Sequence, residues 1–401
     1  MLIDFSAANF KSVRDEALLS MTAQDRKAPD LRYKRELPGQ DFSLLTAAII
    51  FGANASGKST IIEALAVLAE LVQESGSYVR GQKFDQIQPF KLQPGMEKKP
   101  TTFEVEFLAA GSRFRYLLSL TRERVVRERL STFTGKREAL LFERLNDDIE
   151  FGARLAGRKK SIEVWPNTLY LSRAALANQE QLMAVHAWFA FPYQRPGGER
   201  RRWNRTAELA LSNTVPEDKP WIEAFLRAAD LGIEGFDRIE TLGGPGITFR
   251  HLSENRASVS LDMAEESSGT KNLFSAAFLI IHALRNGTLL LLDEPEAGVH
   301  PALIQAILEL FRDPASNPRN AQLIMTSHTA SLLNPDLVRR DQVWFTEKDK
   351  AGVTRLFSLQ DFDKKEIRAE SAFERLYLAG KLGAVPRIKL SELMREGGSD
   401  A

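Results

Sequence analysis

A glycine-rich segment at residues 52–59 has the residue types that bind phosphate groups. It reads Gly-Ala-Asn-Ala-Ser-Gly-Lys-Ser, follows an apolar run and precedes a helical pattern, as the motif G-x-x-x-x-G-K-S requires. Glycines let the backbone approach phosphates, and amides at a helix N-terminus attract anions. We therefore expect a site for the phosphates of a nucleotide. The residues expected to bind the nucleotide are Gly52, Asn54, Ala55, Ser56, Gly57, Lys58, Ser59 and Thr60.

Two acidic residues, Asp293 and Glu294, follow a second apolar run at residues 288–292. An acid that follows a buried strand lies at the carboxyl edge of a parallel sheet, where α/β folds bind ligands. We expect Asp293 to hold Mg²⁺ together with Ser59, and Glu294 to orient the attacking water and accept its proton. Alone, such a pair is more often an ordinary turn, but the upstream phosphate-binding segment favours catalysis.

The segment Glu-Ser-Ser-Gly-Thr at residues 266–270 precedes an apolar helical pattern. Ser267, Ser268 and Gly269 at a helix N-terminus predict a second anion site. Since residues 52–59 already serve this chain's own nucleotide, we expect the second site to meet the γ-phosphate held by another copy. The alternative is a serine that only caps the helix. Ser268 lies 25 residues before Asp293, which leaves room for one helix.

His328 closes the segment Thr-Ser-His, 35 residues after Asp293, at the end of another apolar run. We expect its imidazole to contact the γ-phosphate and take part in catalysis. A lone histidine with a structural role is the alternative. Residues 296–301 follow the acid pair, and in a two-subunit clamp this turn would meet its counterpart. His300 equally suits simple packing before Pro301.

The elements that must position these residues alternate between apolar runs and helical patterns. Segments with apolar residues at helical spacing alternate with short apolar segments, which predicts a parallel sheet covered by helices. In residues 101–151 apolar and polar residues alternate, which predicts an antiparallel sheet. Residues 25–43 suggest loop. Strands are expected at 2–5, 16–22, 44–51, 169–171, 237–242, 247–250, 257–262, 288–293, 321–327 and 342–346, and helices at 58–73, 270–284, 301–311 and 364–379, with 174–230 mainly helical.

Composition narrows the classes of function. The chain has 54 Lys plus Arg against 53 Asp plus Glu, a net charge of +1, so its overall charge does not favour nucleic acid or membranes. It has no cysteine, which excludes disulfides and thiolate chemistry. Residues 273–284 form the most apolar run, too short to span a bilayer, and no signal peptide is evident. We expect a cytoplasmic protein without a membrane partner.

A Pro- and Gly-rich loop at residues 192–205 concentrates arginines and aromatic residues. Such a mixture suits a phosphate backbone with stacked bases, an acidic protein partner, or a solvated loop, and these readings stay open. Its members are Tyr193, Arg195, Arg200, Arg201, Arg202, Trp203 and Arg205.

Taken together, the motifs resemble those of ABC-type ATPases outside transporters: RecF, SMC heads and the OLD family. The chain resembles in particular the stand-alone OLD-like proteins of bacterial anti-phage systems known as RloA, AriA or AbiLi. The segments that carry the resemblance are 9–12, 52–59, 266–271, 293–301, 326–328 and 377–386. The signature differs from the transporter form Leu-Ser-Gly-Gly-Gln, with Glu266 in place of the Leu and Ser268 in place of the first Gly.

The resemblance implies an α/β P-loop NTPase of the ABC-ATPase type, with a mixed core sheet, an antiparallel β subdomain and a helical insertion. We expect residues 1–172 to form an N-terminal ATPase lobe, 173–236 a mainly helical insertion with the basic loop, 237–379 a C-terminal ATPase lobe, and 380–401 a tail. It also implies dimers that close around ATP and Mg²⁺, in some cases larger assemblies, and a nuclease partner of the Toprim type. Since 73 residues follow His328, that nuclease would be a separate polypeptide.

Three functions follow as hypotheses. The first is a cytoplasmic ATPase that senses or restrains a separate effector nuclease in phage defence and responds to a phage-encoded trigger. The second is a DNA-maintenance ATPase similar to RecF or SMC heads that binds nucleic acid directly. The third is an assembly scaffold in which ATP serves as structural glue. The sequence does not identify the effector, the trigger or the stoichiometry.

Overall fold

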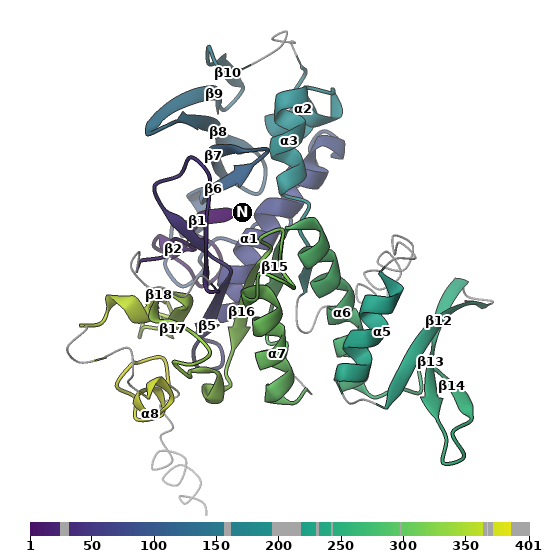
Figure 1. Cartoon of the computed structure of the whole chain (residues 1–401). Helices are drawn as coiled ribbons and strands as arrows, with labels where there is room; N and C mark the ends of the chain where they lie inside the picture. The colour runs from purple at the N-terminus through teal and green to yellow at the C-terminus, as the bar shows by residue number, and fades with distance from the viewer. Residues whose placement is uncertain are drawn as a thin grey trace, which may run out of the picture.

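The computed structural model describes residues 1–24, 32–155, 162–194, 218–229, 232–241, 244–296, 299–363, 367 and 372–385. Two large sheets dominate the fold, and helix α1 (Lys58–Glu74) lies between them (Figure 1). Within the described residues, no helix combines the length and apolar character needed to cross a membrane. The expected P-loop architecture, with a mixed core sheet and an antiparallel subdomain, is confirmed.

The core sheet has the strand order β11-β15-β16-β5-β17-β18. Neighbouring strands from β11 to β17 run parallel, and β18 is antiparallel to β17. Strand β16 therefore lies between β5, which leads into the glycine-rich segment, and β15, which leads into the acid pair. The strands are β5 (Ala47–Phe51), β11 (Tyr193–Gln194), β15 (Leu289–Leu292), β16 (Gln322–Ser327), β17 (Val343–Lys348) and β18 (Thr354–Ser358).

Both faces of the core sheet are buried, which explains why its strands are continuous apolar runs. Ile50 of β5 packs in the core that includes α1, whereas Ile49 and Phe51 pack in a core shared with α6 (Ser268–Asn286) and α7 (Pro301–Arg312). Successive side chains of β5 therefore point to opposite faces of the sheet and pack in two different hydrophobic cores.

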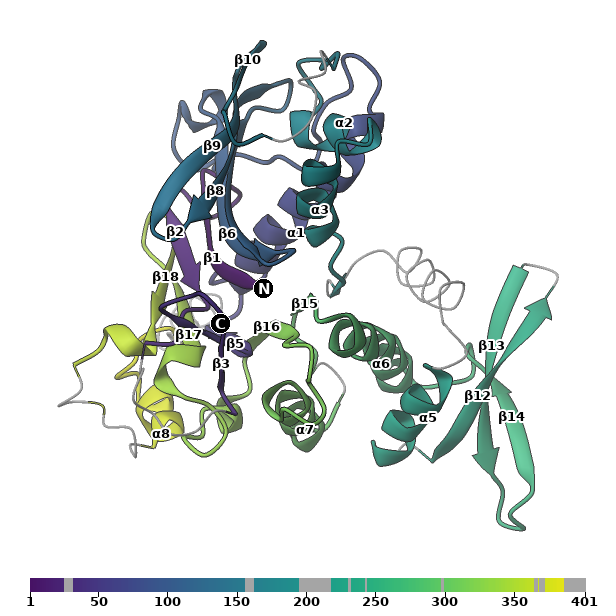
Figure 2. The same cartoon turned by 45° about the horizontal axis from the view of Figure 1, so that its top comes forward.

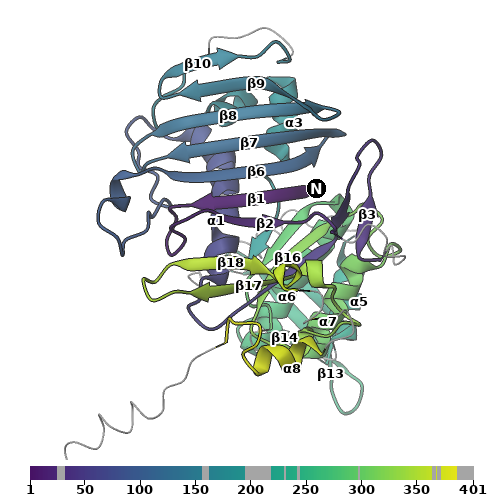
Figure 3. The same cartoon turned by 90° about the vertical axis from the view of Figure 1, so that its left-hand side faces the viewer.

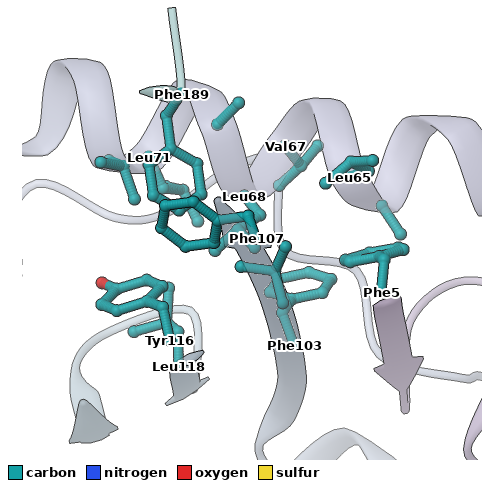
Figure 4. Packing of buried hydrophobic residues seen from close by; sticks show 14 of the residues in the cluster. Phe5, Leu65, Val67, Leu68, Leu71, Phe103, Phe107, Tyr116, Leu118 and Phe189 are labelled. Atoms are coloured by element: carbon teal, nitrogen blue, oxygen red, sulfur yellow. The ribbon is translucent and has the colours of Figure 1, made fainter. Parts of the chain in front are cut away.

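The second large sheet is antiparallel and has the order β10-β9-β8-β7-β6-β1-β2 (Figure 3). One of its faces packs on α1: Figure 4 shows Leu68 of α1 close to Phe103 and Phe107 of β6. The strands are β1 (Leu2–Ala8), β2 (Ala17–Ser20), β6 (Thr101–Ala109), β7 (Ser112–Leu120), β8 (Val125–Thr134), β9 (Arg137–Leu145) and β10 (Asp148–Phe151).

The end of α1 that is far from the glycine-rich segment is joined to α2 (Tyr170–Leu176) and α3 (Glu180–Trp188). Gln73 Nε2 donates to the carbonyl of His186 at 2.6 Å. One residue past the helix, Ser75 Oγ accepts from the Leu169 amide at 3.2 Å, and the Gly76 amide donates to Ser172 Oγ at 2.7 Å. These bonds anchor the C-terminal end of α1.

A smaller unit is set apart from the two sheets (Figure 2). It is a three-stranded antiparallel sheet of β12 (Ile233–Thr241), β13 (Gly244–Leu252) and β14 (Ser258–Asp262), packed on α5 (Lys219–Ala228) and on α6. The domain boundary expected between residues 236 and 237 falls within β12. Phe274 and Phe278 of α6 meet Phe236 in its core, with ring centroids 5.1 and 5.8 Å apart.

Several expected elements differ in the structure. The run 44–51 is two strands, because β4 (Ser43–Leu45) pairs with β3 (Lys34–Glu36) before the bend at Thr46. Part of the loop expected at 25–43 is thus a strand. Strand β18 was not expected, and the helix expected at 364–379 is described only as α8 (Phe373–Leu378). Residues 195–205 of the basic loop lie outside the described residues.

The strand expected at residues 169–171 is wrong: Leu169 is the N-cap of helix α2. The buried carboxylate of Glu128 on β8 accepts hydrogen bonds from the Tyr170 and Leu171 amides, at 2.7 and 2.9 Å, and from the Tyr116 hydroxyl at 3.0 Å. These bonds satisfy the first amides of the helix, which have no partner inside it. The place beside β15 is taken by β11.

Candidate functional site

The candidate site lies where three parallel strands end side by side. The glycine-rich segment begins after Phe51 of β5, His328 follows Ser327 of β16, and Asp293 follows Leu292 of β15. Ser327 is in register with Phe51, and Leu292 with Met325. Parallel neighbours end at the same edge of a sheet, so the three motifs meet at the carboxyl edge, the usual ligand side of such folds.

The glycine-rich segment is held against the last two core strands. A Cβ on Gly52 would lie 2.6 Å from both Ser56 Oγ and Thr346 Oγ1, so only glycine fits this close approach. The Ser56 and Thr346 hydroxyls are hydrogen-bonded at 2.6 Å, and Thr354 Oγ1 donates to the carbonyl of Ser56 at 2.9 Å. Gly57 is the N-cap of α1. Its φ of 108° lies in the left-handed region, which glycine adopts more easily than other residues.

Lys58 is almost fully buried at the base of the segment, with 3% of its side chain exposed. Its ammonium donates to the carbonyls of Gly52 at 3.0 Å and Ala53 at 3.3 Å. It also lies 3.4 Å from Glu294 Oε1. The cation therefore sits between the candidate phosphate loop and the candidate base. Asn54, Ala55 and Ser59 are exposed and Thr60 is half-buried, with its hydroxyl 3.3 Å from that of Ser12.

Asp293 and Ser59 provide the oxygen ligands that Mg²⁺ prefers. Ser59 Oγ donates to Asp293 Oδ1 at 3.1 Å, and the buried Thr326 hydroxyl donates to the same oxygen. Burial raises the pKa of Asp293, while the hydrogen bonds from Thr326 and Ser59 oppose that rise. Within the described chain no group of three or more acidic or His side chains could hold a metal. This donor set fits Mg²⁺ bound by one carboxylate and a hydroxyl, with phosphates and water completing the shell.

Glu294 adopts a backbone conformation that non-glycine residues rarely take, with φ of 47°. Its amide donates to Thr326 Oγ1 at 2.8 Å, so the same hydroxyl binds both members of the acid pair. The carboxylate is 28% exposed and lies 4.0 Å from His328 Nδ1. The structure thus brings Lys58, Glu294 and His328 together.

The segment 266–270 is a helix start that faces solvent. Ser267, not Ser268, is the N-cap of α6, and its hydroxyl accepts from the Thr270 amide at 3.0 Å. Ser267 and Ser268 are exposed and Gly269 is half-buried. In the part of the chain that is described, no hydrogen bond joins these three residues to residues 52–60. His300 Nδ1 accepts from the Ala302 amide at 3.2 Å and so caps α7.

Sequence reasoning missed four residues that organise the site: Thr326, Glu296, Thr346 and Thr354. Thr326 lies two residues before His328, and Glu296 lies two residues after Glu294. This closeness in sequence to candidate catalytic residues could have identified both. Thr346 and Thr354 follow no motif, and only the pairing of β17 with β5 and β18 brings them to the phosphate loop.

A model of the family described as "AAA domain, putative AbiEii toxin, Type IV TA system" matches residues 47–165 and 185–334. Comparison with curated protein sequences finds no match.

Three solved SMC heads align over most of the chain with TM-scores below 0.5. The SMC head domain from Thermotoga maritima is 15% identical, covers 89% of this chain and 98% of its own, and has a TM-score of 0.41. An SMC head bound to the C-winged helix domain of ScpA has 14% identity, 89% and 97% coverage and a TM-score of 0.47. A head with an extended coiled coil, bound to the C-terminal domain of ScpA derived from Pyrococcus furiosus, has 11% identity, 95% and 99% coverage and a TM-score of 0.43.

The two matched ranges of the family model make up more than half of the chain and contain the phosphate loop, the signature, the acid pair and His328. The chain therefore belongs to the AAA-domain family described as putative AbiEii toxin of type IV toxin–antitoxin systems.

Proposed function

We propose that this protein binds and hydrolyses ATP with Mg²⁺. One observation carries the proposal: Lys58, Ser59, Asp293, Glu294 and His328 lie together at one edge of the core sheet, on three neighbouring strand ends. Each side chain has a chemical type that phosphoryl transfer to water uses. Family membership supports the same function.

The roles follow from position. Loop amides and Lys58 bind the β- and γ-phosphates, as the buried ammonium next to the loop carbonyls suggests. Ser59 and Asp293 hold Mg²⁺, which when bound neutralises charge on the phosphates. Glu294 orients the attacking water and accepts its proton, while His328 contacts the γ-phosphate. The candidate base lies next to a cation, with 3.4 Å between Glu294 Oε1 and the Lys58 ammonium.

Two copies are proposed to close around two nucleotides, with Ser268 and Gly269 of each copy meeting the γ-phosphate bound by the other. The exposed start of α6 supports this arrangement, because Ser267 and Ser268 face solvent and make no hydrogen bond with the described phosphate loop. In this arrangement ATP controls assembly.

The biological setting that we propose is a cytoplasmic sensor or regulatory scaffold in anti-phage defence. ATP binding and hydrolysis would control a separately encoded effector nuclease, of the Toprim type, in response to a phage-encoded trigger. The description of the family as a toxin of a toxin–antitoxin system supports such a multi-component role.

Steady-state ATP hydrolysis by purified protein tests the activity. Lys58→Ala should abolish nucleotide binding, measured by calorimetry, because the buried cation is lost. Glu294→Gln should bind ATP but lose turnover by about 100-fold or more, as removal of a general base does. The control is Glu309→Gln, since Glu309 lies on α7 and pairs with Arg312 outside the site. Turnover by Glu294→Gln at the wild-type rate would show that another group is the base.

Light scattering with the Glu294→Gln background tests assembly. ATP should convert monomers to dimers, and Ser268→Glu should prevent that by placing a negative charge where the γ-phosphate is expected, without loss of ATP binding. Ser258→Glu, an exposed substitution on β14, is the matched control. Dimers that persist in Ser268→Glu would contradict the role of the signature.

A further inference from the structure

Glu296 is a buried carboxylate whose hydrogen bonds to the described residues go to the end of strand β16. Its side chain is 4% exposed, and its Oε1 atom accepts from Ser327 Oγ at 2.7 Å and from the His328 amide at 2.9 Å. The Thr329 hydroxyl lies 3.5 Å from the same oxygen. One oxygen thus holds three consecutive residues at the point where β16 leaves the sheet.

The same oxygen is close to the imidazole of His328, 3.6 Å from Nδ1. Glu294 Oε1 lies on the same side, 4.0 Å from Nδ1. Carboxylates near one ring nitrogen favour a proton on that nitrogen and thereby set the orientation of the ring. His328 itself is half exposed, so its ring is not fixed by packing alone.

The second oxygen of Glu296, Oε2, is buried and makes no hydrogen bond with the described residues. A buried carboxylate oxygen without a partner is unfavourable for stability. A glutamine would fill the same space without the charge, so the stability of the turn alone does not explain a glutamate here. The negative charge of Glu296 faces His328, with 3.6 Å between Oε1 and Nδ1.

We infer that Glu296 is a positioning residue for ATP hydrolysis: it fixes the backbone of residues 327–329 and turns Nδ1 of His328 toward the carboxylates, which leaves Nε2 for the γ-phosphate. This inference rests on the proposed function. Glu296 touches no reacting atom in it and acts through His328.

Turnover tests the coupling. In Glu296→Gln the side-chain amide oxygen can still accept from Ser327 and from the His328 amide, whereas the charge is lost. We expect ATP affinity within about twofold of wild type and kcat lower by about 10- to 100-fold, the size of a small misplacement of a catalytic group. His328→Ala should lower kcat by at least as much. The double variant should be no slower than His328→Ala, since both changes remove one function.

Glu309→Gln serves as the control for the loss of a carboxylate and should keep the wild-type kcat. Wild-type turnover in Glu296→Gln would overturn the inference. A double variant whose kcat falls by the product of the two single effects would overturn it as well, because the residues would then act independently. Thermal unfolding of each variant identifies losses that come from misfolding.

If the wild-type protein does not hydrolyse ATP, the proposed function is wrong. A second measurement, of the tautomer of His328, then still tests whether Glu296 positions the ring. Nuclear magnetic resonance of ¹⁵N-labelled imidazoles reports which ring nitrogen carries the proton, and the chain has five histidines, so His328→Gln assigns the signal. The His328 signal should change tautomer in Glu296→Gln and not in Glu309→Gln. An unchanged His328 signal in Glu296→Gln would refute the positioning role.

Discussion

Thr326→Val is the perturbation that most directly tests how the acid pair is held. The Thr326 hydroxyl is fully buried, donates to Asp293 Oδ1 and accepts from the Glu294 amide at 2.8 Å. Valine has nearly the same shape and makes neither bond. Without this anchor, the left-handed backbone at Glu294 can relax and carry the carboxylate away from Lys58.

The expected cost can be worked out from these contacts. Loss of a hydrogen bond to a charged carboxylate costs about 1.5–3 kcal/mol, and leaving the Glu294 amide without its acceptor costs about 1 kcal/mol more. The added methyl group offsets about 0.8 kcal/mol. The free energy of unfolding should therefore fall by about 2–3 kcal/mol. Thr326→Ser keeps the hydroxyl and should lose only about 0.5–1.5 kcal/mol, through the missing methyl.

Urea unfolding without nucleotide measures both variants, with equal slopes required before their midpoints are compared. ATP hydrolysis provides the second assay: kcat should fall at least about tenfold in Thr326→Val, because the base is misplaced, and less in Thr326→Ser. If the valine variant is as stable and as active as the serine variant, the hydroxyl does not organise the acid pair and the reasoning is refuted.

Three further predictions concern the loop, the subdomain and the metal ligand. Gly57→Ala places a Cβ 2.2 Å from Thr354 Oγ1 at a residue with φ of 108°, and should lower the free energy of unfolding, measured with urea, by about 2–4 kcal/mol. The control is Gly95→Ala, where φ is 89° but the space around the Cβ is open, and it should lower the free energy of unfolding by less. Glu128→Gln should cost about 1–3 kcal/mol by the same assay, because one helix amide loses its acceptor, and should leave ATP affinity unchanged; a change in affinity would contradict a purely structural role. Burial raises the pKa of Asp293 above 3.8, so the native state binds its proton more readily than the unfolded chain, and stability from this group is lost as pH rises through the raised pKa. Asp293→Asn should therefore raise the urea midpoint at pH 7 and abolish Mg²⁺-dependent hydrolysis; an unchanged midpoint would contradict the pKa argument.

Much of the candidate site follows from sequence, because its parts depend on local signals. The glycine-rich segment needs a strand before it and a helix after it, and both are visible as apolar periodicity around residues 44–51 and 58–73. The acid pair and His328 each end a buried run. Parallel pairing then brings the ends together without any further information.

The parts that the sequence did not predict depend on tertiary contacts. Leu169 to Leu171 are apolar enough for a strand, but the carboxylate of Glu128, some forty residues earlier in the chain, accepts two amides there and starts a helix. Choosing between Ser267 and Ser268 as the cap depended on the local backbone, which composition does not specify. Thr346 and Thr354 reach the phosphate loop only through sheet pairing.

Helix α1 has a mechanical consequence for this molecule. Its 17 residues make a rod of about 26 Å that starts at the phosphate loop with Lys58. The far end is joined to α2 and α3 through Gln73 and the residues just after the helix. If nucleotide binding at the phosphate loop tilts α1, these bonds will move α2 and α3 as well. A partner that contacts α2 or α3 would then respond to a nucleotide that it does not touch.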